Sequence, residues 1–285
     1  MPTCPFCHQR ASKRDGFGRH GRQRYTCRPC RRDFTALSAS AFSGYHWPAE
    51  VILTAVRWYL SHGISAASVL ELLAERGVDV SKKTVLRWVQ TFGPLLAAEL
   101  RKHRRPLGTR WYTDEMFFFR GKDKWYLYRA VDEHGQVVDV LLREHRDTES
   151  AKAFFERALG RSPQAPTQMI TDHHQPYVKA VQQVVPEAEH IRTGLHRARG
   201  ETTKAIERSH VAARDRLRAA RGVKTITTGQ RFFEGFEALQ ALRRGHIELS
   251  TLLPGQLSGS SPHERAREVV AAVGALGAHL VRPQS

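Results

Sequence analysis

The sequence predicts an α/β protein in which a sheet flanked by helices follows two smaller N-terminal segments. Residues 111–142 alternate between apolar and polar positions with the period of strands, and residues 47–100 have the three- and four-residue spacing of helices. All four cysteines lie within residues 1–30. The expected domains are a cysteine ribbon, a helical domain, a domain with a mixed five-stranded sheet, and a linker with a C-terminal helix, over residues 1–38, 45–101, 107–250 and 251–285.

Composition and charge restrict the kind of partner. The chain has 285 residues, 41% of them apolar, with a formal net charge of +17. Much of the excess basic charge falls in residues 1–50 and 191–231, and clustered Lys and Arg favour a polyanion because neutralised phosphates release condensed counterions. No apolar run approaches the roughly 20 residues that span a bilayer, and no secretory leader is present. We therefore expect a cytoplasmic protein that binds nucleic acid and no membrane.

Two Cys-x-x-Cys pairs, Cys4 with Cys7 and Cys27 with Cys30, indicate a zinc site. Each short turn offers two thiolates to one tetrahedral ion. A segment this short and polar cannot build a core. Metal binding would therefore supply most of its folding free energy. Two disulfides would not suit a cytoplasmic chain, and a redox pair would need only one motif. We expect a structural Zn²⁺ that is closed to catalysis.

Three helical patterns follow the cysteine segment. Pro48 suits a first helical turn. Ser65 offers a cap to a second helix that ends at Gly77, and Ser81 begins the third. Short connections between three helices favour a helix-turn-helix, whose third helix enters the major groove. The residues expected on its outward, DNA-reading face are Lys82, Lys83, Arg87 and Gln90. An ordinary three-helix bundle with a basic solvated face is the alternative.

The next segment alternates between strands and helices. Three strand-like runs joined by turns come first, at residues 111–119, 124–131 and 137–142. A helix, a short buried strand and another helix follow, at residues 148–159, 168–171 and 176–185. This order is that of a ribonuclease H-like sheet, in which the first and fourth strands are neighbours.

Carboxylates lie on the first and fourth of these strands and on a later helix. Asp114 is within the first strand, Asp172 follows the fourth, and Glu207 lies in a helical stretch long enough to cross the sheet. Three carboxylates close together would repel one another unless cations compensated them. Two Mg²⁺ or Mn²⁺ ions about 4 Å apart would do so and would support in-line phosphoryl transfer. Glu115 points to the opposite face of its strand and Glu201 suits a helix start, so neither joins this triad.

Motifs across residues 42–245 resemble those of a known family. They include Val56-Arg-Trp-Tyr, Val85-Leu-Arg-Trp-Val-Gln, Thr113-Asp-Glu, Trp125-Tyr-Leu-Tyr-Arg-Ala-Val-Asp, Ile170-Thr-Asp and Ala205-Ile-Glu-Arg-Ser-His. On these motifs the sequence resembles bacterial transposases of the insertion sequence six family, which share the spacing between Asp172 and Glu207. The resemblance implies a DDE domain with Asp114, Asp172 and Glu207 as the metal ligands.

The resemblance also implies a reaction and its partners. It indicates a transposase that binds the terminal inverted repeats of its element, frees a 3′-hydroxyl at each end and joins it to target DNA. The usual product would be a replicative cointegrate. Because two ends are joined in concert, a homodimer or larger assembly at a prokaryotic nucleoid is expected.

Some residues near the triad depart from the family's pattern. They are His173, Thr203, Lys204 and Ser209, whereas Tyr177 and His210 agree with it. The residues expected to contact DNA beside the third carboxylate are Lys204, Arg208 and His210. A basic helix face that only touches the DNA backbone is the alternative.

Two other functions deserve comparison with the transposase. A DNA-binding regulator that has lost its chemistry would be expected to have lost a triad residue, and none is replaced. A metal-dependent nuclease fits the same residues, because hydrolysis and strand transfer differ only in which hydroxyl attacks.

Overall fold

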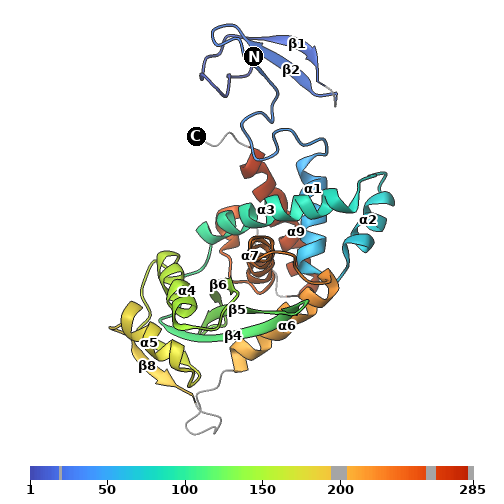
Figure 1. The fold of residues 1–285 in the computed structure, drawn as a ribbon. Helices are drawn as coiled ribbons and strands as arrows, with labels where there is room; N and C mark the ends of the chain where they lie inside the picture. The colour runs from blue at the N-terminus through green and yellow to red at the C-terminus, as the bar shows by residue number, and fades with distance from the viewer. Residues whose placement is uncertain (19–20, 194–203, 255–260, 282–285) are drawn as a thin grey trace. The chain divides into compact units, whose positions relative to one another are not determined.

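Two compact units make up the chain (Figure 1). The computed structural model describes residues 1–18, 21–193, 204–254 and 261–281. The first unit comprises Met1–Ala55 with Leu249–Ser285, and the second comprises Val56–Glu248. Within the described residues, no helix combines the length and apolarity that a bilayer crossing requires.

A small antiparallel sheet forms the N-terminal part of the first unit. Its strands pair in chain order: β1 (Ser12–Phe17), β2 (Gln23–Cys27) and β3 (Asp33–Phe34). Among the described residues, the buried cluster of this sheet consists of Cys4, Cys27 and Phe34. So small a cluster buries too little apolar surface to hold the segment by itself.

The C-terminal helix α9 (Pro262–Val281) belongs to the first unit. Its buried stripe has helical spacing and consists of Val269, Ala272, Val273, Leu276 and Leu280. The amide of Ala41 donates to the carbonyl of Leu280 at 3.1 Å. Near the start of α1 (Ala49–Ser61), a Cβ added to Gly277 would lie 2.9 Å from the Leu53 side chain. The expected C-terminal helix thus forms after α8 (Leu249–Leu252) and docks on its own chain.

Helices α2 (Ala66–Ala74) and α3 (Lys82–Lys102) form where the sequence predicts them. The Ser65 and Ser81 hydroxyls accept hydrogen bonds from the amides of the third residues beyond them, at 3.1 and 3.2 Å. The structure adds that α3 crosses α7 (Ile226–Arg243) at very close range. A Cβ added to Gly235 would lie only 2.9 Å from the Cα of Gly93. The predicted reading helix is therefore packed directly on a helix that also covers the sheet.

The second unit is built on a mixed five-stranded sheet (Figure 1). Its strands are β4 (Arg110–Arg120), β5 (Asp123–Asp132), β6 (Val137–Arg143), β7 (Gln168–Thr171) and β8 (Glu189–Arg192). They lie in the order β6-β5-β4-β7-β8, with β5 antiparallel to both neighbours and β7 parallel to β4 and β8. The predicted ribonuclease H-like order, with the first and fourth strands adjacent, is confirmed.

Helices cover both faces of the sheet. On one face, α4 (Thr148–Gly160) and α5 (Gln175–Val184) enclose an apolar cluster that includes Tyr128, Phe154 and Tyr177. On the other face lie α6 (Lys204–Ala220) and α7, where the Phe118 and Phe233 rings pack with centroids 6.0 Å apart. Because side chains alternate along a strand, successive residues of β4 meet different helical layers.

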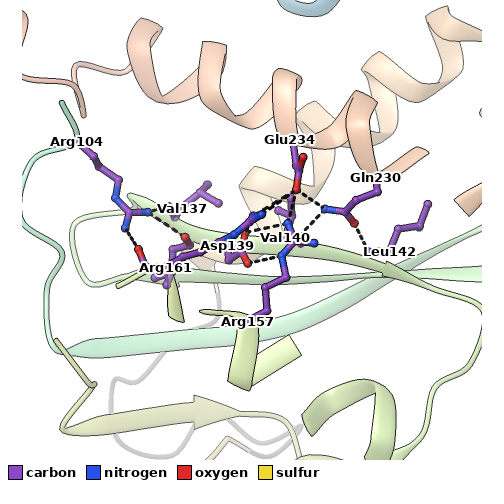
Figure 2. Close-up of polar contacts among 10 residues, drawn as sticks. Arg104, Val137, Asp139, Val140, Leu142, Arg157, Arg161, Gln230 and Glu234 are labelled. Atoms are coloured by element: carbon purple, nitrogen blue, oxygen red, sulfur yellow. Dashed lines mark hydrogen bonds and ion pairs between the residues drawn. The ribbon is translucent and has the colours of Figure 1, made fainter. Parts of the chain in front are cut away.

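An ion-pair network ties α4 and α7 to the edge strand β6 (Figure 2). Asp139 of β6 accepts hydrogen bonds from Arg157 of α4 and from Arg161, which directly follows α4, each at 2.9 Å. Both arginines also contact Glu234 of α7, and Gln230 donates to Glu234 at 3.1 Å. Burial alone would raise the pKa of Glu234, but the Gln230 hydrogen bond and the two arginine charges hold that pKa below its usual value. The fold itself supplies the cations for these carboxylates.

Candidate active site

The parallel pairing of β4 with β7 brings Asp114 and Asp172 to neighbouring positions. Tyr112 lies opposite Ile170 in this register. Asp114 lies two residues beyond Tyr112 in β4, and Asp172 lies two residues beyond Ile170, just after β7 ends. Asp172 directly follows β7, and its Oδ1 atom accepts a hydrogen bond from the His174 amide at 3.0 Å. Helix α5 begins at the next residue.

The carboxyl of Asp114 is held in an unfavourable environment for its charge. Burial, followed by the adjacent charge of Glu115, raises the pKa of Asp114 to about 7. The charge of Asp172 acts in the same direction, whereas a backbone hydrogen bond from Glu115 and the charge of Arg146 oppose it. A carboxyl in this condition gains ionisation when a cation is placed beside it.

His210 of α6 lies beside Asp114 but does not neutralise it. The His210 Nδ1 atom is 3.7 Å from the Asp114 Oδ2 atom. Burial, and then the charges of Arg129 and Arg214, lower the pKa of His210 to about 3. The imidazole is therefore neutral at physiological pH, and this pair is a polar contact without a net ionic attraction.

Arg146 bridges two acidic side chains from the connection before α4. Its guanidinium contacts Glu115 through Nε and donates to Asp172 Oδ2 at 3.2 Å. Glu115 also accepts from the hydroxyl of Tyr177 in α5. Asp114 contacts α6 whereas Glu115 contacts α5, so the two residues face opposite layers as strand alternation predicts. Arg146 thus links the orientation of Asp172 to a carboxylate with 6% side-chain exposure.

Helix α6 carries the third predicted carboxylate. Glu207 lies one helical turn before His210, whose ring contacts Asp114, and α6 packs against β4 and β5. Residues three apart share a helix face, so the backbone of Glu207 lies on the side of the sheet that carries Asp114. The side chains of Lys204, Glu207, Arg208 and Ser209 lie outside the described part of the chain. The whole of Thr203 lies outside it as well.

The four cysteines converge in the first unit. Their Sγ atoms all lie within 4.8 Å of one another, with Cys4 to Cys30 at 3.7 Å and Cys7 to Cys27 at 3.5 Å. Zn–S bonds of about 2.3 Å in a tetrahedron separate sulfur atoms by about 3.8 Å. All four are free thiols, so the spacing suits one tetrahedral ion.

The two cysteine turns have the same backbone shape. His8 and Arg31 each follow the second cysteine of a pair, and their φ angles are 57° and 56°. Burial raises the pKa of Cys4, but hydrogen bonds from the amides of Phe6 and Cys7 bring that pKa down to about 7. These amides favour the thiolate, which is the form that binds metal.

The predicted DNA-contacting residues divide into two groups. Lys82, Lys83 and Arg87 are exposed on α3. Gln90 is half-buried and donates to the carbonyl of Thr228 at 3.1 Å, so its predicted outward orientation is wrong because α7 covers that side of α3. His210 is likewise 3% exposed. The structure corrects its expected place from a DNA-facing surface to a position beneath Asp114.

Sequence reasoning missed Arg146 as a neighbour of the triad. Arg146 follows the carboxyl end of β6, and Asp172 follows the carboxyl end of β7. The pairings with β5 and β4 make these two strands point the same way, so their carboxyl ends lie at one edge of the sheet. A cation after one such strand and an acid after the other was the available signal.

Comparisons with known proteins agree with this fold. A family model described as a DDE domain matches residues 108–246. The transposase for insertion sequence-like element IS431mec of Staphylococcus aureus (strain Mu50) is 34% identical over 194 residues, covering 68% of this chain and 84% of the relative. The transposase for insertion sequence element IS257 in transposon Tn4003 of Staphylococcus aureus has the same identity and coverage.

Fold and relatives together define a DDE-type polynucleotidyl transferase. The chain belongs to the insertion sequence six family of DDE transposases.

Two solved structures give more distant matches. The HTLV-2 integrase catalytic core domain in complex with magnesium (trimeric form) is 17% identical with a TM-score of 0.33, covering 47% of this chain and 88% of that chain. The catalytic core domain of BIV integrase is 14% identical with a TM-score of 0.35, covering 55% of this chain and 92% of that chain. These scores indicate a remote likeness only.

Proposed function

We propose that this transposase cuts the ends of an insertion sequence and joins them to target DNA, with Asp114, Asp172 and Glu207 as its catalytic metal ligands. The observation that carries the proposal is the proximity of Asp114 and Asp172 on neighbouring strands, where burial and the charges of Glu115 and Asp172 raise the pKa of Asp114 to about 7. Such a carboxyl is stabilised most by a nearby cation. Glu207, one turn before a residue that contacts Asp114, would complete the ligand set.

The donor set fits hard divalent cations. The side chains of Asp114 and Asp172 are 28% and 40% exposed, so their oxygens are accessible to an ion and to phosphate. Carboxylate oxygens suit Mg²⁺ or Mn²⁺ better than Zn²⁺. We propose two ions per active site, which when bound would activate the attacking oxygen and stabilise the leaving oxygen.

The protein's own groups orient the reactants in this scheme. Asp114 and Asp172 would hold the ions that position the phosphate, and Arg146 orients Asp172 by donating a hydrogen bond to it. A 3′-hydroxyl at each element end attacks a phosphorus of target DNA, so one P–O bond forms as another breaks. No covalent enzyme intermediate is needed, and the family's expected product is a replicative cointegrate.

The N-terminal segments would hold the DNA. We propose that Lys82, Lys83 and Arg87 of α3 contact the terminal inverted repeats, with Lys204 and Arg208 beside the scissile phosphate. Joining two ends in concert requires a homodimer or larger assembly. Domain limits at residues 1–38, 45–101 and 107–250 remain our working division of these roles.

We propose Zn²⁺ for the cysteine ribbon. The spacing of the four sulfurs and the absence of disulfides among them support this ion. Metal analysis of the purified chain is expected to give one zinc per molecule. The Cys4→Ser variant is expected to lose that zinc, and a zinc content unchanged by the substitution contradicts the assignment.

A strand-transfer assay tests the proposed function directly. Labelled element ends, target DNA and Mg²⁺ are incubated with wild type, Asp114→Asn, Asp172→Asn or Glu207→Gln. Asp215→Asn, an exposed carboxylate on α6, serves as the matched control. Joined product only from wild type and the control is expected.

Other outcomes distinguish the alternatives. Triad variants as active as wild type contradict the assignment of the ligands. Cleavage without joining by wild type, under conditions that allow the ends to pair, indicates a nuclease. Specific binding of the ends without any chemistry indicates a regulator.

A further inference from the structure

One face of the β4–β5 hairpin carries exposed aromatic rings beside a lysine. Phe117 and Phe119 of β4 lie opposite Tyr126 and Lys124 of β5. Residues that alternate along a strand share a face with their cross-strand partners, so these four residues form one surface, named here the hairpin face. Phe117 is 49% exposed and Phe119 is 68% exposed. Adjoining large aromatic side chains with this exposure mark an interaction surface.

Apolar side chains are packed on the opposite face of the same hairpin. Met116 and Leu127 are buried there, and Phe118 packs against Phe233 of α7. On the hairpin face, the apolar cluster beneath α4 and α5 reaches Tyr126 but, among the described residues, does not include either exposed phenylalanine. The hairpin face is therefore an uncovered extension of the core surface.

The hairpin face combines ring faces with positive charge. The Phe117 and Phe119 rings lie 5.9 Å apart between centroids at an interplanar angle of 82°. Lys124 Nζ lies 3.8 Å from the Phe117 ring centroid and 5.5 Å from that of Tyr126. At the turn, Asp123 is paired with Arg120 at 3.7 Å, so its charge is already matched. Lysine over aromatic rings suits an anionic partner with flat apolar groups.

The hairpin face begins next to the candidate active site. Phe117 lies two residues beyond Glu115 on the same face of β4, about 7 Å along the strand. Glu115 contacts Arg146, which in turn donates to Asp172. Asp114 projects from the opposite face of β4, whereas Asp172 lies at the edge of the sheet and is joined to the Glu115 side through Arg146. A DNA strand that passes Asp172 at this edge would bring neighbouring nucleotides within reach of Phe117.

We propose that the hairpin face stacks unpaired bases of the DNA strand whose phosphate lies in the active site, with Lys124 contacting an adjacent phosphate. The inference rests on the proposed function. Aromatic side chains stack on any base, and lysine neutralises the backbone, which is how proteins hold single strands. Paired bases within a duplex do not offer their faces, so the hairpin face selects DNA that is open beside the cut. A second copy of this chain would match the rings but carries the same net charge of +17, so the positive charge of Lys124 favours DNA as the occupant.

Binding measurements in magnesium-free buffer test the stacking without any chemistry. Dissociation constants are compared for element-end DNA with unpaired bases beside the cut and for the same sequence fully paired. Phe117→Ala and Phe119→Ala are each expected to weaken binding of the unpaired DNA by about tenfold and to change binding of the duplex little. Phe119→Leu is expected to show the same loss and Phe119→Trp to retain wild-type affinity. Val270→Ala, at a 52% exposed apolar position, is the control and is expected to bind as wild type.

Crosslinking and charge removal give independent readouts. Iodouracil placed at the unpaired positions is expected to crosslink on irradiation to Phe117 or Phe119. Lys124→Gln is expected to reduce the slope of log affinity against log salt by about 0.7, the value for one phosphate of a single strand. Circular dichroism and urea unfolding of each variant are expected to match wild type, because the substituted side chains are exposed.

The outcomes separate this inference from the proposed function. Unchanged affinity for unpaired DNA in both phenylalanine variants, with crosslinks elsewhere, overturns the stacking surface. A change in the oligomeric state of these variants, measured by light scattering without DNA, also overturns it. Such a change would assign the hairpin face to contact with a second copy. Strand transfer by wild type is measured in the same preparation. If wild type transfers no strand but the stacking measurements give the expected results, the outcome counts against the proposed function alone.

Discussion

Asp139 and Glu234 face two arginines, whereas Asp114 has the neutral imidazole of His210 as its contact on α6. Burial raises the pKa of Glu234, but the Gln230 hydrogen bond and the two arginine charges bring that pKa below its usual value, whereas burial raises the pKa of Asp114 to about 7. Burial therefore acts in the same direction on Glu234 and on Asp114. What differs is the source of the compensating cation: the fold provides it around β6 (Figure 2), and we propose that a bound divalent ion provides it at Asp114.

The largest expected effect is the loss of chemistry without loss of structure. Asp172→Asn is expected to lower the strand-transfer rate by about 10³-fold or more, equivalent to about 4 kcal/mol, because a proposed metal ligand is removed. Urea unfolding is expected to show wild-type stability within about 0.5 kcal/mol. Activity within threefold of wild type in a rapid-quench assay would remove Asp172 from the catalytic group.

The network around β6 is expected to show the reverse behaviour. Glu234→Gln leaves Arg157 and Arg161 with one carboxylate between them, and we expect the free energy of unfolding to fall by about 2 kcal/mol. The rate of strand transfer is expected to be unchanged at temperatures where the variant is folded. Chemical denaturation gives the stability, and the double variant with Arg157→Gln is expected to recover part of the loss. An unchanged unfolding midpoint would show that the network contributes no stability.

The titration of Asp114 is expected to make stability depend on pH in one direction. Its pKa is raised from 3.8 to about 7, so the folded state holds a proton that the unfolded state releases between those values. Magnesium-free protein therefore loses stability as pH rises from about 4 to 7, by roughly 2 kcal/mol after allowance for solvent access. Asp114→Asn is expected to exceed wild type in stability at pH 8 and to match it near pH 4. Unfolding curves at both pH values test this, and a wild-type chain more stable than the variant at pH 8 contradicts it.

The smallest effect is expected at Arg146. Arg146→Gln removes the cation between Glu115 and Asp172, and we expect strand transfer to fall about tenfold, equivalent to about 1.4 kcal/mol. Because Asp172 would be less well oriented, the Mg²⁺ concentration for half-maximal rate is expected to rise. Arg146→Lys is expected to restore part of the rate. A lower rate with an unchanged magnesium dependence would argue against a positioning role.

The sequence predicted the elements whose pattern repeats over several residues. β4, β5 and β6 are long, alternating and bounded by turns, so they formed within a few residues of their predicted limits. β8 was not located from the sequence. The strand Glu189–Arg192 has only four residues, two of them exposed and none fully buried, so it lacks a burial pattern. Its place comes from parallel pairing with β7, which is a tertiary property.

The candidate site was predictable to the extent that strand order fixes it. Adjacent first and fourth strands sufficed to bring Asp114 and Asp172 together. Gln90 and His210 were misplaced because a helical pattern gives the face of a residue but not which neighbouring element covers that face. Arg146 lies in a connection without periodicity, so its position after β6 was the signal available in the sequence, and its ion pairs in the folded chain identify its partners.

The crossing of α3 and α7 at Gly93 and Gly235 gives the molecule a mechanical property. Two backbones in such close approach leave no room for a side chain between them, so we expect α3 and α7 to move together. α3 has 21 residues, which makes it a rod about 30 Å long that starts at Lys82 and Lys83. If DNA is held at that end, the rod acts as a ruler, and the distance from the bound repeat to the cleaved phosphate is set by the helix.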